Sequence, residues 1–158
     1  MRQDYEDKVM KHYTRVAQES GLSASCTMED EYIREGESRA ILRLIELAAK
    51  SAAASLRVLD VGCGNGYTLR TLAERIRDGG LSGSIELLGI EKNHELRQLA
   101  SKMNEGLPVT IAEGEWFAAL PDDARGTLDV IVSNPPYIAE HEDLPEVVYL
   151  GNVAELAA

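Results

Sequence analysis

The stretch LRVLDVGCGNG, Leu56–Gly66, decides the fold of this chain. Its first half is an apolar run typical of a buried strand, and the strand closes on Asp60. Its second half is rich in glycine, and helical periodicity begins directly after it at Tyr67. A strand, a glycine-rich turn and a helix form the first half of a nucleotide-binding βαβ unit. We therefore predict an α/β fold, with an unrelated glycine-rich turn as the alternative.

The glycine spacing in this turn indicates the kind of ligand. The spacing is G-x-G-x-G, from Gly62 to Gly66, whereas the dinucleotide fingerprint is G-x-G-x-x-G and seats a pyrophosphate on a helix N-terminus. Asp60 stands just before the glycines, and a carboxylate there suits a cationic ligand better than a phosphate. S-adenosylmethionine carries a sulfonium and an ammonium group and has no phosphate. The pattern thus favours this cofactor over NAD and disfavours an oxidoreductase.

A second acidic residue follows the next apolar run. Residues 85–90 read as a strand, and the run ends at Glu91. In related folds an acid at this place accepts hydrogen bonds from ribose hydroxyl groups. The alternative is an acidic residue in the first turn of the following helix, where the helix dipole favours it.

The whole chain alternates between helical and strand patterns. We expect helices at 4–19, 30–50, 67–77 and 94–104, and strands at 56–60, 85–90, 109–112 and 128–133. Asn93 is a plausible N-cap, and residues 104–106 resemble a C-cap. This order predicts a Rossmann-like, doubly wound parallel sheet with N-terminal helices.

The expected domain organisation has two parts. Residues 1–50 form an N-terminal helical segment, and residues 51–158 form a cofactor-binding domain that lacks the strands usually following the fourth. The fourth strand then lies at an open edge, which proteins normally cover. We expect either a second copy or partner chain over this edge, or a chain that is part of a longer protein.

The helix expected at 30–50 has an amphipathic pattern. Its inward residues are predicted to be Ile33, Ile41, Leu44, Ile45 and Ala48. Two groups of basic residues, Arg34–Arg43 and Arg70–Arg77, are interpreted as solvated helix faces.

Composition narrows the class of protein. The chain has 158 residues and a net charge of −11, which disfavours a broad nucleic-acid surface. It has no apolar run long enough for a membrane span and no signal-like N-terminus, so a cytoplasmic location is expected. Cys26 and Cys63 show no metal or redox spacing, and Cys63 is expected to be only a small residue of the loop. No metal is predicted.

The tetrapeptide Asn134-Pro135-Pro136-Tyr137 follows the last predicted strand. Open α/β sheets place ligands at the carboxyl ends of their strands. The prolines stiffen the turn and remove N–H donors, which leaves the Asn134 side-chain oxygen and the Pro135 carbonyl as acceptors beside an aromatic ring. Such an edge fits an NH2 group on a planar, conjugated system. The alternative is a plain Pro-Pro loop exit.

These segments together resemble the class I S-adenosylmethionine-dependent methyltransferases. Within them the chain is most similar, from about 33 to 149, to the HemK-like glutamine N5-methyltransferases of peptide-release factors. The resemblance rests on Val58–Gly66, Glu91, Gly114–Phe117, Ser133–Ile138 and Pro145–Val147. More weakly, Ile33-Arg34 and Glu37-Ser38 resemble a segment that touches the cofactor. The sequence departs from the family at Glu115, which replaces an Asp, at Leu150-Gly151, which replace Glu-Pro, and in its first 50 residues.

The resemblance implies a role for each matching residue. The catalytic residues it implies are Asn134, Pro135 and Tyr137, and the acceptor-binding residues are Asn134, Pro136 and Tyr137. The cofactor-binding residues it implies are Asp60, Gly62, Gly64, Gly66, Glu91, Glu115 and Trp116. For Trp116 the alternative is a core aromatic residue.

The predicted function is methylation of a planar NH2 group, with S-adenosyl-L-methionine as donor and a protein glutamine amide as acceptor. Because the Asn-Pro-Pro-Tyr motif is shared with adenine-N6 methyltransferases, RNA or DNA is an alternative substrate. An alternative of another class is a non-catalytic cofactor-binding or partner subunit.

Overall fold

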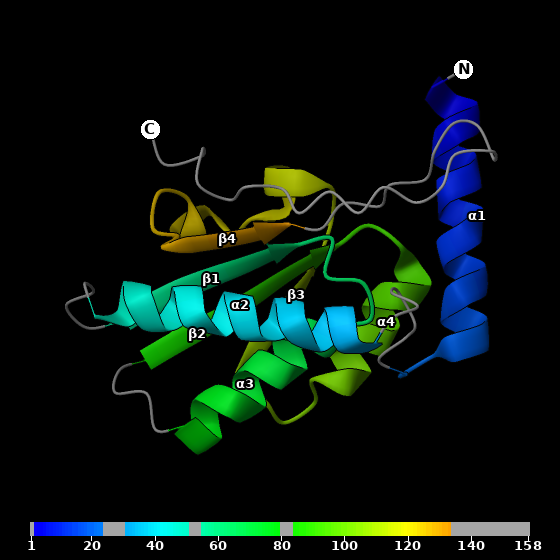
Figure 1. Ribbon diagram of the computed structural model, residues 1–158. Helices are drawn as coiled ribbons and strands as arrows, with labels where there is room; N and C mark the ends of the chain where they lie inside the picture. The colour runs from blue at the N-terminus through cyan, green and yellow to red at the C-terminus, as the bar shows by residue number, and fades with distance from the viewer. Residues whose placement is uncertain (1, 24–30, 51–54, 80–83, 134–158) are drawn as a thin grey trace.

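The computed structural model describes residues 2–23, 31–50, 55–79 and 84–133 (Figure 1). Its helices are α1 (Arg2–Ser20), α2 (Glu31–Ala49), α3 (Tyr67–Gly79) and α4 (His94–Met103), with two 3-10 turns, η2 (Trp116–Ala119) and η3 (Asp122–Ala124). Its strands are β1 (Ser55–Val61), β2 (Ser84–Glu91), β3 (Val109–Glu113) and β4 (Val130–Ser133). Within the described ranges, no helix is long and apolar enough to cross a membrane.

The four strands form one parallel sheet in the order β3-β2-β1-β4. The chain moves from β1 outward to β3 and then returns to the other side of β1. Strand order therefore reverses between β1 and β4, and open α/β sheets bind ligands at such a point, beyond the carboxyl ends of the strands. The predicted α/β, Rossmann-like parallel sheet with N-terminal helices is confirmed.

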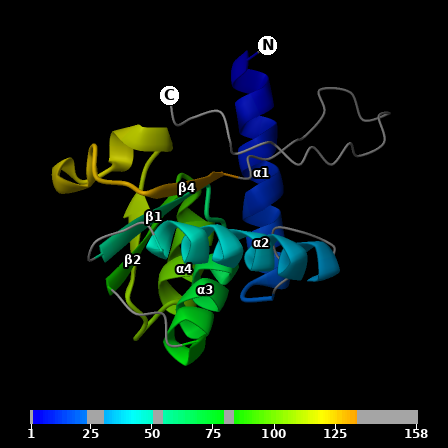
Figure 2. The same ribbon diagram turned by 60° about the vertical axis from the view of Figure 1, so that its left-hand side comes forward.

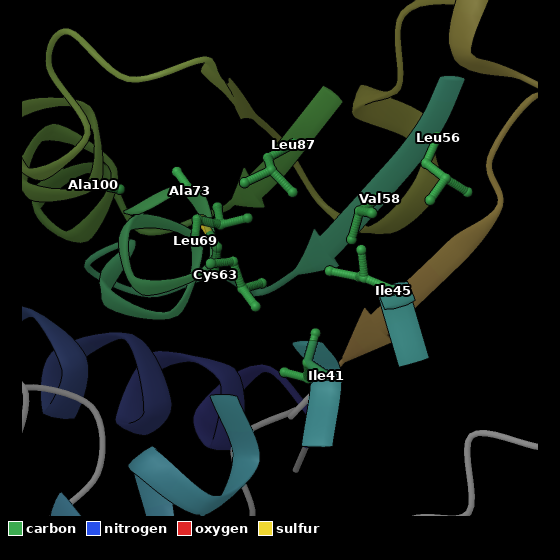
Figure 3. Close-up of a cluster of buried hydrophobic side chains, with 10 residues drawn as sticks. Ile41, Ile45, Leu56, Val58, Cys63, Leu69, Ala73, Leu87 and Ala100 are labelled. Carbon is green, nitrogen blue, oxygen red and sulfur yellow. The ribbon is translucent and has the colours of Figure 1, made fainter. Parts of the chain in front are cut away.

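Two clusters of buried apolar side chains pack against the sheet, one on each face. On one face, α2 and α3 pack against the strands, and Figure 3 shows Ile45 of α2 directed toward Val58 of β1, with Ile41 of α2 in the same cluster. Leu69 of α3 and Leu87 of β2 belong to the same buried cluster. The opposite face is covered by the 3-10 turns; its buried residues are Leu59, Val61, Leu88, Ile90, Leu120 and Ala124. Burying these side chains on both faces explains why β1 and β2 read as nearly continuous apolar runs.

The inward face of α2 differs from the prediction. Ile41 and Ile45 are buried as expected, but Ile33 and Leu44 are 39% and 40% exposed, so their inward placement was wrong. The buried line continues instead through Ser38 and Arg34, at helical spacing from Ile41. The reason is that the first half of α2 lies against the polar turn after β1 rather than against apolar side chains.

The fourth strand is shorter than predicted. It begins at Val130, not at residue 128. The Asp129 carboxylate accepts the Arg57 backbone N–H (2.8 Å), while the Asp129 N–H donates to the Arg57 carbonyl (2.9 Å). A side chain thus replaces the backbone acceptor at this position, and regular pairing starts one residue later.

Helix α1 stands beside α4, away from the sheet (Figure 2). Its Ala17 is buried against Leu96 of α4, with Tyr13, Val16 and Leu99 packed around them. The predicted N-cap of α4 is confirmed, since the Asn93 side chain accepts the Leu96 N–H (3.0 Å). This packing brings α1 close to the carboxyl end of β2.

Candidate cofactor-binding site

The glycine turn after β1 is held over the end of β2. The N–H groups of Gly62 and Cys63 both donate to the Ile90 carbonyl, at 2.8 and 3.1 Å. Cys63 is buried, and its side chain belongs to the apolar cluster under the turn, in keeping with its expected role as a small residue. Burial is the main cause that raises the pKa of its thiol, so this cysteine stays protonated and unreactive.

Two positions in the turn require glycine, each for a different physical reason. Gly66 has φ +76°, and a Cβ there would lie 2.5 Å from Asn104 Nδ2 and 3.0 Å from the Ala100 Cα, so the turn packs directly on α4. Gly62 also has φ +76°, yet a Cβ there would meet nothing within 4 Å. The space beside Gly62 is therefore open for a ligand to approach the backbone closely.

Glu91 ends β2 with its carboxylate beneath the turn. It is buried, and it accepts the N–H groups of Gly64 (2.9 Å) and Asn93 (2.7 Å). Burial raises the pKa of Glu91, and these backbone hydrogen bonds oppose the rise. Since Glu91 is the last strand residue and α4 begins at His94, the alternative of a first-turn helix residue was wrong. A carboxylate has about four acceptor sites, and the backbone N–H groups of Asn93, Gly64 and Lys92 do not use all of them, so acceptor capacity remains for a ligand.

Asp60 occupies the centre of a buried group of charges at the end of β1. Burial raises its pKa to about 7, the positive charge of Arg34 opposes this, and the negative charges of Glu91 and Glu37 add to it. The buried carboxylate is therefore only partly ionised near neutral pH. A cationic ligand beside it would favour the ionised form.

Arg34 of α2 faces this group of charges. It is only 6% exposed, its Nη2 donates to Asn65 Oδ1 (3.4 Å), and its guanidinium carbon lies 5.4 Å from the centre of the Tyr67 ring. The interpretation of Arg34–Arg43 as a solvated face was thus wrong for Arg34. The spacing of Arg34, Ser38 and Ile41 on one helix face was the signal that could have identified it.

Asn65, in the middle of the turn, was assigned no role from the sequence. Its side chain is 0% exposed and contacts four groups. The amide NH2 donates to the carbonyls of Gly21 (3.1 Å) and Ser23 (2.9 Å), and Oδ1 accepts from Arg34 and from the Tyr67 N–H (3.3 Å). No local periodicity marks such a residue, because its partners come from other segments of the chain.

Glu115 and Trp116 follow β3, the neighbour of β2. The register pairs Glu91 with Glu113, so both residues lie just beyond the same edge of the sheet as Glu91. Glu115 is exposed and pairs with Lys92 (3.3 Å). Trp116 is 54% exposed with φ 52°, so the alternative of a core aromatic residue was wrong. A non-glycine residue held in this left-handed region is uncommon and points to a functional constraint.

The end of β4 lies beside the end of β1. The register pairs Ser133 with Val61, and the Ser133 hydroxyl donates to the Val61 carbonyl (3.3 Å). The predicted catalytic and acceptor-binding residues, Asn134 to Tyr137, fall outside the described residues.

The donor set of this site fits S-adenosylmethionine. Two buried carboxylates, Asp60 and Glu91, flank a turn whose Gly62 leaves its backbone open. Arg34 adds a positive charge beside Asp60. A ligand with an ammonium, a sulfonium, a carboxylate and ribose hydroxyl groups matches this mixture of charges and acceptors.

Known proteins with similar sequences are methyltransferases, which agrees with a site that fits S-adenosylmethionine. A family model described as a methyltransferase domain matches residues 58–150. A release factor glutamine methyltransferase of Burkholderia pseudomallei is 36% identical over 104 residues, which are 63% of this chain and 35% of that protein. A 4-amino-L-phenylalanine/4-methylamino-L-phenylalanine methyltransferase of Streptomyces pristinaespiralis is 33% identical over 99 residues, which are 63% of this chain and 31% of that protein.

A solved structure supports the fold alone. It is a crystal structure of a Listeria monocytogenes protein assigned to the class I S-adenosylmethionine-dependent methyltransferases. The two structures match with a TM-score of 0.50 and 16% sequence identity, over 69% of this chain and 32% of that chain. This chain spans about a third of the length of the curated relatives it matches. Because the family model covers more than half of its residues, the chain belongs to the methyltransferase domain family, and the predicted class I S-adenosylmethionine-dependent methyltransferase is confirmed at that level.

Proposed function

We propose that this chain catalyses N-methylation of a planar NH2 group, with S-adenosylmethionine as the methyl donor and a protein glutamine amide as the acceptor. The observation that carries the proposal is the register of β1 and β4. It places Ser133, the residue before the Asn-Pro-Pro-Tyr motif, beside Val61, the residue after Asp60. Consecutive Cα atoms are about 3.8 Å apart, and this supports the proposal that the motif following Ser133 serves the same site.

Each half of the cofactor has matching residues. Asp60 and the glycines at 62, 64 and 66 would hold the methionine half, with Arg34 as the countercharge for its carboxylate. Glu91 would accept the ribose hydroxyls through its free acceptor sites. Trp116 would border the adenine, and Glu115 would accept from the adenine amine. The exposure of Glu115 and Trp116 beyond β3 supports this assignment, since both side chains are accessible to a ligand at that edge of the sheet.

The acceptor chemistry follows from the motif. An amide nitrogen is a poor nucleophile because its lone pair is delocalised. The Asn134 side-chain oxygen and the Pro135 carbonyl would each accept one N–H, which aims the nitrogen and stabilises the positive charge that develops on it. Tyr137 would stack on the planar group, with Pro136 stiffening the turn between them. When bound, S-adenosylmethionine supplies an electrophilic methyl group, and the surplus proton on nitrogen leaves to water.

Two observations favour a protein amide over a nucleic acid. The net charge of −11 opposes binding to a phosphate backbone. Of the relatives named above, the release factor glutamine methyltransferase is named for a protein glutamine, whereas the amino-phenylalanine methyltransferase supports only an NH2 group on a conjugated system as the acceptor. Adenine in RNA or DNA shares that group and remains the alternative acceptor.

A calorimetric titration with S-adenosylhomocysteine tests the cofactor half. Saturable one-to-one binding is expected, and no binding by the unaltered chain would overturn the proposal in favour of a partner subunit. The Asn134→Ala variant tests the catalytic half. Its transfer rate should fall by at least about a thousandfold, because both aim and charge stabilisation are lost, while its dissociation constant for the cofactor product stays within about twofold.

Radiolabelled S-adenosylmethionine identifies the acceptor. After incubation with cell extract, protein and nucleic-acid fractions are digested and the labelled product is analysed by mass spectrometry. We expect N5-methylglutamine in the protein fraction. Label found only as N6-methyladenine would show that the acceptor is a nucleic acid.

A further inference from the structure

The side chain of Asn65 connects three helices to the glycine turn. Its NH2 group donates to the carbonyls of Gly21 and Ser23 at the end of α1. Its oxygen accepts from Arg34 of α2 and from the N–H of Tyr67, the first residue of α3. An asparagine amide has two donors and two acceptor sites, and all four are used here. Asn65 therefore has no capacity left for a ligand and acts through the backbone that it holds.

The carbonyls it binds lie directly after the end of α1. Gly21 has φ +53° and donates its N–H to the Ala17 carbonyl (3.0 Å), which ends the helix in the left-handed conformation. The Asn65 amide binds the chain just beyond this end, so release of α1 would break both of these hydrogen bonds.

A second contact lies on the other side of the proposed cofactor site. Asn93, whose N–H donates to Glu91, uses its side-chain Nδ2 to donate to Thr14 Oγ1 of α1 (3.0 Å). Three residues further along α1, Ala17 is buried against Leu96 of α4. Helix α1 thus contacts the neighbours of both parts of the site, the glycine turn and the end of β2.

We propose that Asn65 is a positioning residue that couples the docking of α1 to the conformation of the cofactor turn. The inference rests on the proposed function, because it takes residues 62–66 as the S-adenosylmethionine site. Gly64 and Gly66 flank Asn65 with φ values of +57° and +76°, so the turn has little stiffness of its own. The bonds from the Asn65 side chain to α1, α2 and α3 restrict the turn further, in addition to its bonds with Ile90, Glu91 and Asn104.

The coupling acts in both directions. If docked α1 raises the affinity for the cofactor by some factor, bound cofactor strengthens the docking of α1 by the same factor. It follows that residues 1–50 and 51–158, although divided by sequence, work as one unit in cofactor binding. The first 50 residues would then serve the cofactor site rather than act independently of it.

Three variants of the full 158-residue chain test this inference. Asn65→Ala removes all four bonds. Thr14→Val keeps the shape of a side chain on α1 and removes only the contact with Asn93. Asn104→Ala is the matched control, since Asn104 is also a buried asparagine bonded to the turn, but through Gly66 (3.1 Å) and from the end of α4 rather than α1. Binding of S-adenosylhomocysteine is measured by calorimetry, and amide hydrogen exchange is followed over residues 10–20.

In ligand-free protein, Asn65→Ala should speed exchange in α1 at least tenfold, whereas Asn104→Ala should leave it unchanged. The dissociation constant should rise about ten- to a hundredfold in Asn65→Ala and about three- to tenfold in Thr14→Val, in line with the number of hydrogen bonds lost. In the unaltered chain, S-adenosylhomocysteine should slow exchange in α1, and this effect should shrink in both variants.

The outcomes separate the two proposals. If the unaltered chain binds no S-adenosylhomocysteine, the proposed function fails and the coupling fails with it. If it binds, but Asn65→Ala and Thr14→Val bind equally well, the coupling alone is refuted. Equal loosening of α1 by Asn104→Ala and Asn65→Ala would also refute it, because any disturbance of the turn would then have the same effect. Thr14→Val decides the question if Asn65→Ala does not fold.

Discussion

Replacing Asp60 with asparagine should make the protein more stable above neutral pH and at the same time weaken cofactor binding. Burial raises the pKa of Asp60 from 3.8 to about 7. Because the pKa of the folded state lies above that of the unfolded state, the stabilising contribution of this group is fully present below about pH 4 and is lost as pH rises through 7. Over these roughly 3 pH units the loss amounts to about 4 kcal/mol, at 1.36 kcal/mol per unit.

Asp60→Asn removes this loss because the amide does not ionise. The two proteins should have similar free energies of unfolding near pH 4, and the variant should exceed the unaltered protein by up to about 4 kcal/mol at pH 8. Urea unfolding followed by circular dichroism at pH 5, 6, 7 and 8 measures the difference. With a typical slope of about 2 kcal/mol per molar urea, the midpoint at pH 8 should rise by about 2 M.

The control is Asp122→Asn, which removes the same charge from an exposed carboxylate on η3. It should leave the pH dependence of unfolding unchanged. Calorimetry on Asp60→Asn should show at least tenfold weaker binding of S-adenosylmethionine, since the amide cannot balance a cation. Parallel stability curves for Asp60→Asn and the unaltered protein from pH 5 to 8 would refute the reasoning about the buried carboxylate.

Two further predictions concern backbone conformation. Gly66→Ala should lower the free energy of unfolding by about 3 kcal/mol, because the new Cβ clashes with Asn104 in addition to the strain of a positive φ. The control Gly106→Ala has φ +78° but no atom within 4 Å of the new Cβ, so it should lower the free energy of unfolding by only about 1 kcal/mol. Equal urea midpoints for the two variants would contradict the role of the clash. Trp116→Gly relieves a left-handed backbone (φ 52°), so the urea midpoint should not fall, while the dissociation constant for S-adenosylhomocysteine should rise severalfold. Unchanged affinity in that variant would remove Trp116 from the adenine site.

The strand, turn and helix around β1 could be predicted without a structure, because each depends on residues that are neighbours in the sequence. The apolar run that closes on Asp60, the glycine turn and the helix after it follow from side-chain periodicity and backbone preference over neighbouring residues. The N-cap of α4 at Asn93 was predictable for the same reason, since the cap and the N–H that it accepts are three residues apart. The parallel sheet followed from the alternation of strands and helices.

The polar contacts that assemble the site could not be predicted in this way. Arg34 and Asn65 are 31 positions apart, and Asn65 and Gly21 are 44 positions apart. The sequence of α2 shows a periodic apolar face, and periodicity alone favours Ile33 and Leu44 as its continuation. Only the packing of α2 against a polar turn places Arg34 on the buried side.

The sequence by itself therefore determined the fold class, the family and the two acids, Asp60 and Glu91, at the strand ends. It did so because each motif or strand end involved is formed by residues close together in the chain. The tertiary structure alone decided that Arg34 is buried beside Asp60 and that Asn65 binds the end of α1. Those contacts exist only after distant segments have packed, since a buried polar group takes its partners from whatever the fold brings within hydrogen-bond distance.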